Sequence, residues 1–345
     1  MTSASTSGDK RRSAPIDPTT SETPVAVSIL IVNYNGGPLL ARCVASLSAA
    51  ADSLSFEAIV VDNASTDDSL QQLAQLPAAP WLTIIRRADN AGFAAATNQA
   101  AGIATGDFLL LLNPDTECRP GSIRRLTHYL RGQDPAGPDA VAAVGPRLVN
   151  ADGSPQRSAW RGFPGLRSAL VDACYLWKWP ALPIVRGLET RLPDGDSAAA
   201  APLDVDHLLG ACILIPRPVW QRVGPLDDGY FLFLEETDWC HRAKAAGYRI
   251  VLLPTAEVLH HGQHSVYQVP ELSSPSYYRG YLRFARRAGA SPARLLLLRA
   301  ILLTAILMRL LLWTARLAGS RRALATRMLR GYRAALRVVL SPVAP

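Results

Sequence analysis

The last part of the chain, residues 272–345, contains no aspartate, glutamate or lysine, although it carries fourteen arginines. The formal net charge of the whole protein is +8, so the remainder of the chain has a net charge of −6. This asymmetry indicates an anionic partner for the C-terminal part. The long apolar stretches between the arginines favour a membrane surface over nucleic acid.

Cysteines are also few: the five in the chain are widely spaced and never form a C-x-x-C pair. This excludes a zinc knuckle and a disulfide framework and is typical of the reducing cytosol. The chain has no G-x-x-x-x-G-K-[ST] sequence, and no G-x-G-x-x-G follows its first apolar run, which argues against a dinucleotide site. Residues 1–24 lack the apolar stretch of a signal peptide, so we predict a disordered leader and no translocation.

Short apolar runs alternate with helical patterns through much of the sequence. With 49% hydrophobic residues, there is ample material for a large core. The alternation predicts an α/β protein with a mainly parallel sheet flanked by helices. The expected strands are 25–32, 56–61, 81–85, 107–112, 141–149 and 207–215, with helices over 38–50, 67–75 and 92–104 and an irregular region over 150–200.

Acidic side chains follow two of the expected strands. The apolar run 109–112 leads into Asn113-Pro114-Asp115, and Asp62 ends an earlier run. Ligands of parallel sheets bind beyond the carboxyl ends of the strands. Asp115 is therefore a candidate ligand for Mg²⁺ or Mn²⁺ held against a diphosphate, and Asp62 for a nucleotide's base or ribose. In both loops the alternative is capping of the helix that follows. Asp115 would be the cap in its own loop, and Ser65 or Thr66 would be the cap in the loop after Asp62.

Four ordered blocks resemble the inverting glycosyltransferases of family 2. They are SILIVNYN at 28–35, VDNASTD at 61–67, Asn90-Ala91-Gly92-Phe93 with Asn98, and LNPD at 112–115. The resemblance implies a GT-A fold over roughly 25–290 and a nucleotide-diphosphate sugar as donor. It also implies that the donor pocket is lined by Asn33, Asn35, Asp62, Asn90, Gly92, Asn98 and Asn113 and that Asp115 is the metal-binding aspartate. Asn113 at the first position of the family's D-x-D-type element is similar to the rhamnosyltransferase branch.

Three acids lie within four residues, at Glu235, Glu236 and Asp238. Their mutual repulsion is expected to raise at least one pKa, which suits a general base. The segment resembles an acidic element that precedes a helix in the family. Transfer with inversion needs one base for the acceptor hydroxyl. We predict Glu236 as this base, with Glu235 as its close competitor and Asp238 orienting or capping; the alternative is acids gathered at a helix N-terminus for its dipole.

The resemblance assigns two further residues. His260, in a segment that also holds His261 and His264, matches the histidine that completes the family's metal site. Zinc is disfavoured because no cysteine is near and no H-E-x-x-H is present, while an ordinary loop histidine stays an alternative. Gly210 matches a block beside the sugar and acceptor site, where glycine lets the backbone approach a ligand, or it only permits tight packing.

Residues 295–313 are apolar enough to suggest a membrane span, but Arg299 and Arg309 interrupt them. A central arginine costs about 2.5 to 3.5 kcal/mol for insertion. At about 100° per residue, Arg294, Arg299, Arg309 and Arg316 fall within roughly 140° of one another. We therefore predict an interfacial helix whose arginines face anionic headgroups. The alternative is that this helix packs on the catalytic domain or on a second subunit.

Together these interpretations predict a metal-dependent inverting glycosyltransferase, peripheral on the inner face of the cell membrane. It would move a sugar, L-rhamnose from dTDP-rhamnose by the branch resemblance, to a glycan or lipid-linked acceptor of the cell envelope. An inactive nucleotide-sugar-binding scaffold and a sugar nucleotidyltransferase are the alternatives. The predicted divisions are a leader (1–24), a nucleotide-sugar half (25–120), an acceptor half (121–290) and a basic amphipathic helical tail (291–345).

Overall fold

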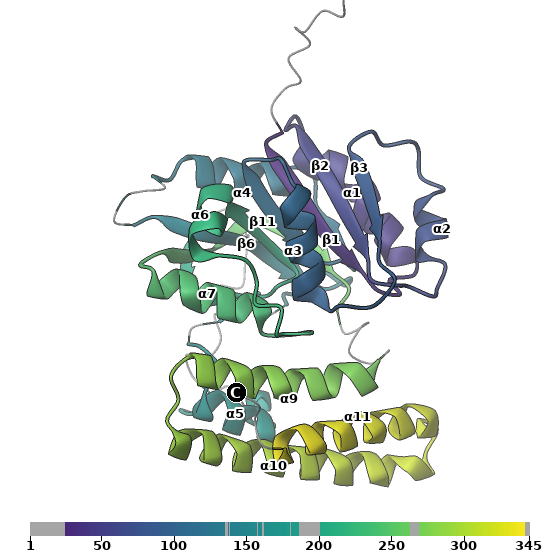
Figure 1. Cartoon of the computed structure of the whole chain (residues 1–345), viewed down its shortest axis with the longest axis vertical. Coiled ribbons are helices and arrows are strands. Elements are labelled where there is room, and N and C mark those ends of the chain that lie inside the picture. The colour runs from purple at the N-terminus through teal and green to yellow at the C-terminus, as the bar shows by residue number, and fades with distance from the viewer. Residues whose placement is uncertain are drawn as a thin grey trace, which may run out of the picture.

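An α/β layer built on a central sheet stands on a layer of helices in the computed structural model (Figure 1). The structure describes residues 25–134, 137, 139–156, 158–160, 162–179, 181–185, 201–262 and 269–341. The predicted leader and His264 lie outside these residues.

The sheet is parallel at one end and mixed at the other. Across the sheet the strands are β3 (Leu82–Arg86), β2 (Phe56–Asp62), β1 (Val27–Asn33), β4 (Phe108–Leu112), β10 (Cys212–Pro216), β6 (Val141–Val149), β11 (Arg249–His260) and β5 (Thr116–Cys118), with β8 (Leu203–Val205) also on β11. Parallel pairing joins β3 to β2, β2 to β1 and β1 to β4, and β6 also lies parallel to β11. β10 runs antiparallel to both of its neighbours, β4 and β6.

Helices cover both faces of this sheet, so its central strands are buried on both sides. Ile29 and Ile31 of β1 belong to one hydrophobic cluster, whereas Leu30 and Val32 belong to the other. Because both sets are apolar, β1 has the continuous hydrophobic run of a doubly covered strand. The first cluster includes residues of α1 (Pro38–Ala51), α2 (Ser69–Leu73) and α4 (Ser122–Arg131), and the second includes residues of α3 (Phe93–Ile103), α6 (Arg217–Val223) and α7 (Glu235–Ala245).

A third hydrophobic cluster holds the helical layer together and joins it to the α/β layer through Tyr230 and Leu234. In Figure 1, α9 lies beneath the α/β layer, and α10 and α11 form the far end of the molecule. The predicted boundary at 290/291 falls between α9 and α10, which share this cluster. The layer comprises α5 (Leu166–Ala173), α9 (Pro270–Arg287), α10 (Pro292–Ala315) and α11 (Arg322–Leu340).

Two local expectations were wrong. The strand predicted over 207–215 is interrupted: β9 (His207–Leu208) pairs with β7 (Ala159–Trp160), and β10 begins only at Cys212. Part of the predicted irregular region over 150–200 is helical, in α5 and in the short 3₁₀ helix η1 (Leu176–Lys178). The interruption of the strand matters for the site, because it places Gly210 in a turn between two sheets.

The orientation of α10 is the reverse of the predicted one. Arg309 is only 7% exposed, and its guanidinium donates to the Asp172 carboxylate over 3.0 Å. Arg299 donates to the carbonyl oxygens of Val339 and Ser341 at the C-terminal end of α11, where a cation is favoured by the helix dipole. The prediction that these two arginines face lipid headgroups is therefore wrong, because groups of the protein itself engage them.

Candidate functional site

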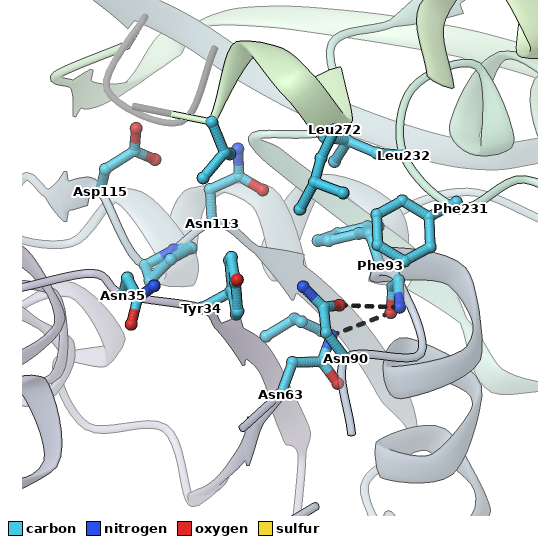
Figure 2. A pocket seen from close by; sticks show the side chains of 14 residues that line it. Tyr34, Asn35, Asn63, Asn90, Phe93, Asn113, Asp115, Phe231, Leu232 and Leu272 are labelled. Carbon is cyan, nitrogen blue, oxygen red and sulfur yellow. Dashed lines mark hydrogen bonds between the residues drawn. The ribbon is translucent and has the colours of Figure 1, made fainter. Parts of the chain in front are cut away.

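A pocket of about 110 Å³ lies at the carboxyl ends of β1, β2 and β4 (Figure 2). One end of it is apolar, with Phe93 and Phe231, and Asp115 lies at the opposite end. Asparagines line the space between. The pocket is bounded by Val32, Tyr34, Asn35, Asn63, Asn90, Gly92, Phe93, Asn113, Pro114, Asp115, Phe231, Leu232, Val269 and Leu272.

Of the residues predicted to bind the donor, Asn33, Asp62 and Asn98 are not among those that line the pocket, and neither is Gly210, which lies beside Glu236. Asn33 is fully buried, and its amide donates to the Asp62 carboxylate at 2.8 Å and to Ser69 Oγ at 2.9 Å. The side chain of Asn98 bonds to both the carbonyl oxygen and the N–H of Leu226. Asn33, Asp62 and Asn98 brace the loops behind the pocket.

Asn35, Asn90, Gly92 and Asn113 do line the pocket. Asn90 Oδ1 accepts from the N–H of Gly92 over 3.0 Å, and the N–H of Phe93 donates to the carbonyl oxygen of Phe231 over 2.8 Å. Gly92 has φ 85°, and a Cβ at this position would lie 2.3 Å from the same Phe231 oxygen. Glycine is therefore required for the start of α3 to dock against Phe231.

The structure brings Asp115 and His260 together although they are far apart in the chain. His260 ends β11 and pairs with Thr116 of β5, directly after Asp115. Its Nε2 lies 3.4 Å from Asp115 Oδ1, and both residues are buried. The neighbouring His261 instead bonds Glu117 at 2.8 Å.

These two donors fit a divalent cation that completes its shell with substrate. Among the described residues no group of three or more histidine, cysteine, aspartate or glutamate side chains is arranged to hold a metal ion, so the donor set does not fit a structural zinc site. Mg²⁺ and related cations are commonly held by one or two protein ligands together with substrate phosphates and water. Asp115 and His260 could hold such a cation at the rim of the pocket.

Gln156 is part of this arrangement and was not anticipated. Its Oε1 lies 2.9 Å from His260 Nδ1, and its Nε2 donates over 2.6 Å both to the His260 carbonyl oxygen and to Asn150 Oδ1. Since Nε2 makes two donations, the oxygen is the atom that accepts from Nδ1–H. The lone pair of His260 is thereby left on Nε2, facing Asp115. No sequence motif marks Gln156, which lies in the region expected to be irregular.

The acidic pair Glu235 and Glu236 begins α7 after an unusual turn. Phe233 and Leu234 have φ of 70° and 72°, which places two bulky residues in succession in the left-handed region. Such a conformation is rare outside glycine and is found at functional sites when the surrounding packing enforces it. Leu234 is buried in the third hydrophobic cluster, which holds the turn in place.

Burial raises the pKa of both Glu235 and Glu236, and for Glu235 the neighbouring Glu236 carboxylate raises it further. Glu235 is only 5% exposed, and within the described part of the chain its Oε2 has no hydrogen-bond partner. Glu236 Oε1 accepts from Thr237 Oγ1 over 3.2 Å. Because Glu236 borders a cavity and Glu235 is enclosed, Glu236 is the acid within reach of a ligand.

The cavity beside Glu236 is distinct from the pocket that contains Asp115. Its volume is about 320 Å³. It lies between α7, α5 and α9, with three aromatic side chains, Trp177, Tyr277 and Tyr281, in its walls. Its other boundaries are Gly162, Pro164, Ser168, Val171, Asp172, His207, Leu209, Phe233, Leu234, Glu236 and Thr237.

Two chain segments lie between these spaces. Phe231 and Leu232 line the first pocket, and the next two residues line the second cavity. At Gly210 an added Cβ would lie 3.3 Å from Glu236 Cγ, while the carbonyl oxygen of the following Ala211 accepts from the Asn113 N–H over 2.9 Å. Two adjacent residues of one turn thus contact both sites: Gly210 packs against the Glu236 side chain, and Ala211 accepts a hydrogen bond from Asn113.

Asp238 lines neither space. It is 2% exposed, and Arg242 and Arg287 each donate to its carboxylate over 2.9 Å. Tyr230 also donates to it over 3.3 Å. Asp238 therefore ties α7 to α9 and does not reach a ligand.

His207 is a second unanticipated residue in the wall of the larger cavity. Burial lowers its pKa to about 4, so the imidazole is neutral at physiological pH. Its Nδ1 lies 3.4 Å from Thr237 Oγ1, directly after Glu236 in the chain. The sequence did not predict this position, because His207 is a single histidine within an expected strand and belongs to no motif.

Comparison with known proteins agrees with this architecture. The family model for Glycosyl transferase family 2 matches residues 28–168. The N-acetylglucosaminyl-diphospho-decaprenol L-rhamnosyltransferase of Mycobacterium tuberculosis is 31% identical over 272 residues, which cover 75% of this chain and 84% of that protein. The chain belongs to glycosyltransferase family 2. Another relative, the low-salt glycan biosynthesis hexosyltransferase Agl10 of Haloferax volcanii, is 26% identical over 77% of this chain and 75% of its own length.

Solved structures confirm the GT-A fold for this family 2 chain. GalNAc-T7 with UDP, GalNAc and Mn²⁺ matches with a TM-score of 0.53 at 16% identity, over 77% of this chain and 48% of that one. The mannosyltransferase PcManGT of Pyrobaculum calidifontis, in complex with GDP-Man and Mn²⁺, matches with a TM-score of 0.51 at 16% identity. The match covers 96% of this chain and 91% of that one. The protein is thus a nucleotide-sugar-dependent glycosyltransferase, as family membership establishes, and its resemblance to rhamnosyltransferases is confirmed by the mycobacterial relative.

Proposed function

We propose that this glycosyltransferase transfers L-rhamnose from a nucleotide-diphosphate donor to a hydroxyl of a lipid-linked saccharide, with inversion and with a divalent cation. The observation that carries the proposal is the pairing of Asp115 with His260 at the rim of a pocket that adjoins the Glu236 cavity. The choice of sugar and acceptor is supported by the mycobacterial relative, whose name specifies both.

In the proposed complex the nucleotide occupies the asparagine-lined pocket, with its diphosphate toward Asp115. The amides of Asn35, Asn90 and Asn113 offer donors and acceptors to a base, a ribose and phosphate oxygens. A cation held by Asp115 and His260 would neutralise charge on the departing diphosphate. Gln156 keeps the imidazole of His260 in the tautomer that can serve as a ligand.

Glu236 is the proposed general base. Its carboxylate takes the proton of the acceptor hydroxyl while the oxygen forms a bond to the anomeric carbon. The bond from that carbon to the diphosphate oxygen breaks, and its electron pair leaves with the nucleoside diphosphate. Attack on the face opposite the leaving group inverts the configuration. The raised pKa of Glu236 lets the carboxyl hold the abstracted proton.

The cavity beside Glu236 is the proposed acceptor site. Its aromatic side chains, Trp177, Tyr277 and Tyr281, offer flat apolar faces with polar edges, on which a sugar ring can pack. The turn at Gly210 and Ala211 lies between this cavity and the donor pocket. We place the anomeric carbon of the donor at this junction, where Glu236 reaches the incoming hydroxyl.

The test uses nucleotide-sugar turnover with and without Mn²⁺. Glu236→Gln should lower kcat by about 10²- to 10⁴-fold, the usual effect of losing a general base, while nucleotide-sugar binding measured by thermal shift persists. Glu257→Gln, a change at a half-exposed acid paired with Arg119, is the matched control and should leave kcat unchanged.

Three outcomes would contradict the proposal. Turnover unaffected by Glu236→Gln would reject the base, and turnover independent of Mn²⁺ and of Asp115→Ala would reject the cation site. Release of pyrophosphate in place of a nucleoside diphosphate would indicate a nucleotidyltransferase.

A further inference from the structure

The outward side of α10 is an apolar stripe, with two large exposed side chains near the start of the helix and four in its second half. Ala300 and Thr304 are exposed between these two groups. Leu296 and Leu311, near the two ends of the stripe, are 71% and 73% exposed. At 1.5 Å per residue, the stripe from Leu296 to Leu312 is about 24 Å long. Its members are Leu296, Leu297, Leu307, Met308, Leu311 and Leu312.

The stripe carries no charge and no free hydroxyl donor. Within α10, which is described in full, the exposed polar residues from Leu296 onward are Thr304 and Thr314. Thr304 donates to the Ala300 carbonyl oxygen over 3.0 Å, and Thr314 to that of Leu310 over 2.8 Å. Both hydroxyls are thus satisfied within the helix, so this side can enter a medium without water.

Exposed arginines lie at both ends of the stripe and on the helix that packs beside α10. Arg294 and Arg316 are exposed at the two ends of α10, and further exposed arginines lie on the neighbouring α11 and the turn before it, at 321, 322, 330, 333 and 337. Residues 272–345 contain no acid to balance them. α10 and α11 form one end of the molecule, away from the sheet (Figure 1).

We propose that this end of the protein docks on an anionic lipid bilayer, with the apolar stripe in the acyl region and the neighbouring arginines at the headgroups. An apolar face bordered by cations is the pattern of helices that lie in the plane of a membrane. Arginine side chains have long apolar stems, so their charges can remain in the headgroup layer while the stems contact apolar surface.

The same contacts argue against a spanning helix. Pro292–Ala318 is long and apolar enough to cross a membrane. However, the opposite side of α10, with Leu302 and Ile306, packs in the cluster shared with α5, α9 and α11. If α10 spanned the bilayer, these arginine-rich partners would have to enter the hydrocarbon with it.

A second copy of the chain is a poorer occupant of the stripe than lipid. Two such ends facing each other would bring their arginine borders together, and like charges so placed repel. Neither end contains an acid between 272 and 345 to relieve that repulsion. Anionic headgroups supply the missing charge.

The docked helix is also tied to the Glu236 cavity. Arg309 of α10 donates to Asp172, and Asp172 forms part of the cavity wall. A membrane-bound α10 would therefore hold the cavity close to the bilayer, where the sugar of a lipid-linked acceptor is found. This link, unlike the docking itself, rests on the proposed function.

The test is flotation of the full chain with phosphatidylcholine vesicles that contain or lack phosphatidylglycerol. The double variant Leu307→Glu with Leu311→Glu should lower binding to the anionic vesicles by roughly tenfold or more, because two carboxylates enter the apolar layer. Ile84→Glu with Ile103→Glu is the matched control; these side chains are 39% and 51% exposed on the α/β layer. It should bind as the wild type does. Vesicles without phosphatidylglycerol should bind the wild type more weakly.

Sedimentation velocity without vesicles and nucleotide-sugar binding by thermal shift accompany the flotation. Retained nucleotide binding shows that a variant is folded, whichever way the vesicle result falls. Unchanged flotation of the leucine variant, or an equal loss in the isoleucine control, would overturn the proposal. A wild-type dimer that fails to float and dissociates on the leucine substitutions would assign the stripe to a second copy. Equal binding to neutral vesicles would show that the arginines do not contribute to docking and would overturn the proposed contact with anionic headgroups.

Discussion

Gln156 holds His260 at two points, since its Oε1 accepts from Nδ1–H over 2.9 Å and its Nε2 donates to the backbone carbonyl oxygen over 2.6 Å. One side chain thus fixes both the ring orientation and the protonated nitrogen. Partners of this kind commonly contribute 10- to 100-fold to metal affinity, about the size of effect expected here.

Gln156→Leu should accordingly weaken Mn²⁺ binding by about 10- to 100-fold, since the imidazole of His260 would no longer be held in one tautomer and orientation. At saturating Mn²⁺ kcat should stay close to that of the wild type, because Asp115 and His260 are both present. Electron paramagnetic resonance of free Mn²⁺, measured with nucleoside diphosphate, gives the affinity directly.

Two comparison variants sharpen this prediction. Gln156→Glu keeps an oxygen that accepts from Nδ1–H but loses the donation to the carbonyl oxygen, so it should restore part of the affinity. Gln71→Leu, at an exposed position on α2, should bind Mn²⁺ as the wild type does. An unaltered affinity in Gln156→Leu would show that Gln156 does not position the ligand.

Glu235 should make the protein less stable at neutral pH than at acidic pH. Burial raises its pKa well above the ordinary value, so the folded chain retains a proton that the unfolded chain has lost. The contribution of Glu235 to stability is therefore full below the unfolded pKa of about 4.3 and is lost as the pH rises toward the folded pKa. Glu235→Gln removes this dependence.

Thermal unfolding across pH measures the effect. The Tm of Glu235→Gln should exceed that of the wild type at pH 7, and the two values should converge as the pH falls toward about 4. Gln71→Leu, which changes an exposed uncharged side chain, serves as the control and should leave the pH dependence of Tm as in the wild type. If Glu235→Gln lowers Tm at neutral pH, the Glu235 carboxylate stabilises the folded protein and the prediction is wrong.

Gly92→Ala and Gly102→Ala should change the stability of the protein in opposite directions, although Gly92 is the N-cap of α3 and Gly102 lies within the same helix. At Gly92 the added Cβ would lie 2.3 Å from the Phe231 carbonyl oxygen, and φ is 85°. At Gly102 no heavy atom lies within 4 Å of the added Cβ. We expect Gly92→Ala to lower the free energy of unfolding by more than about 1 kcal/mol and Gly102→Ala to raise it by about 0.5 to 1 kcal/mol.

Urea titration of the two variants gives these free energies. Gly92→Ala should also weaken nucleotide-sugar binding, because Asn90 and Phe231 line the same pocket. If the two variants were equally stable, the backbone at Phe231 would have to move away from the added methyl group at little energetic cost.

A mainly parallel α/β sheet could be predicted from the sequence because its central strands are apolar on both faces, as the split of Ile29 and Leu30 between two clusters explains. The GT-A fold itself was implied by the resemblance of four motif blocks to family 2. Gln156 was beyond prediction, since its bonds to His260 span 104 residues and follow no motif. Periodicity revealed two faces of α10 but not which one is buried. That choice depends on Asp172, a distant carboxylate that draws Arg309 inward.

The segment from Phe231 to Leu234 separates two chambers, with its first half facing one and its second half the other. A partition of this kind cannot be adapted to one occupant without disturbing the other. If the Glu236 chamber binds the acceptor, as proposed, evolution toward a new acceptor is expected to spare this segment and to act on the other residues of that chamber. There Trp177, Tyr277 and Tyr281 border only the chamber of Glu236, so their replacement would diversify specificity at no cost to recognition of the nucleotide.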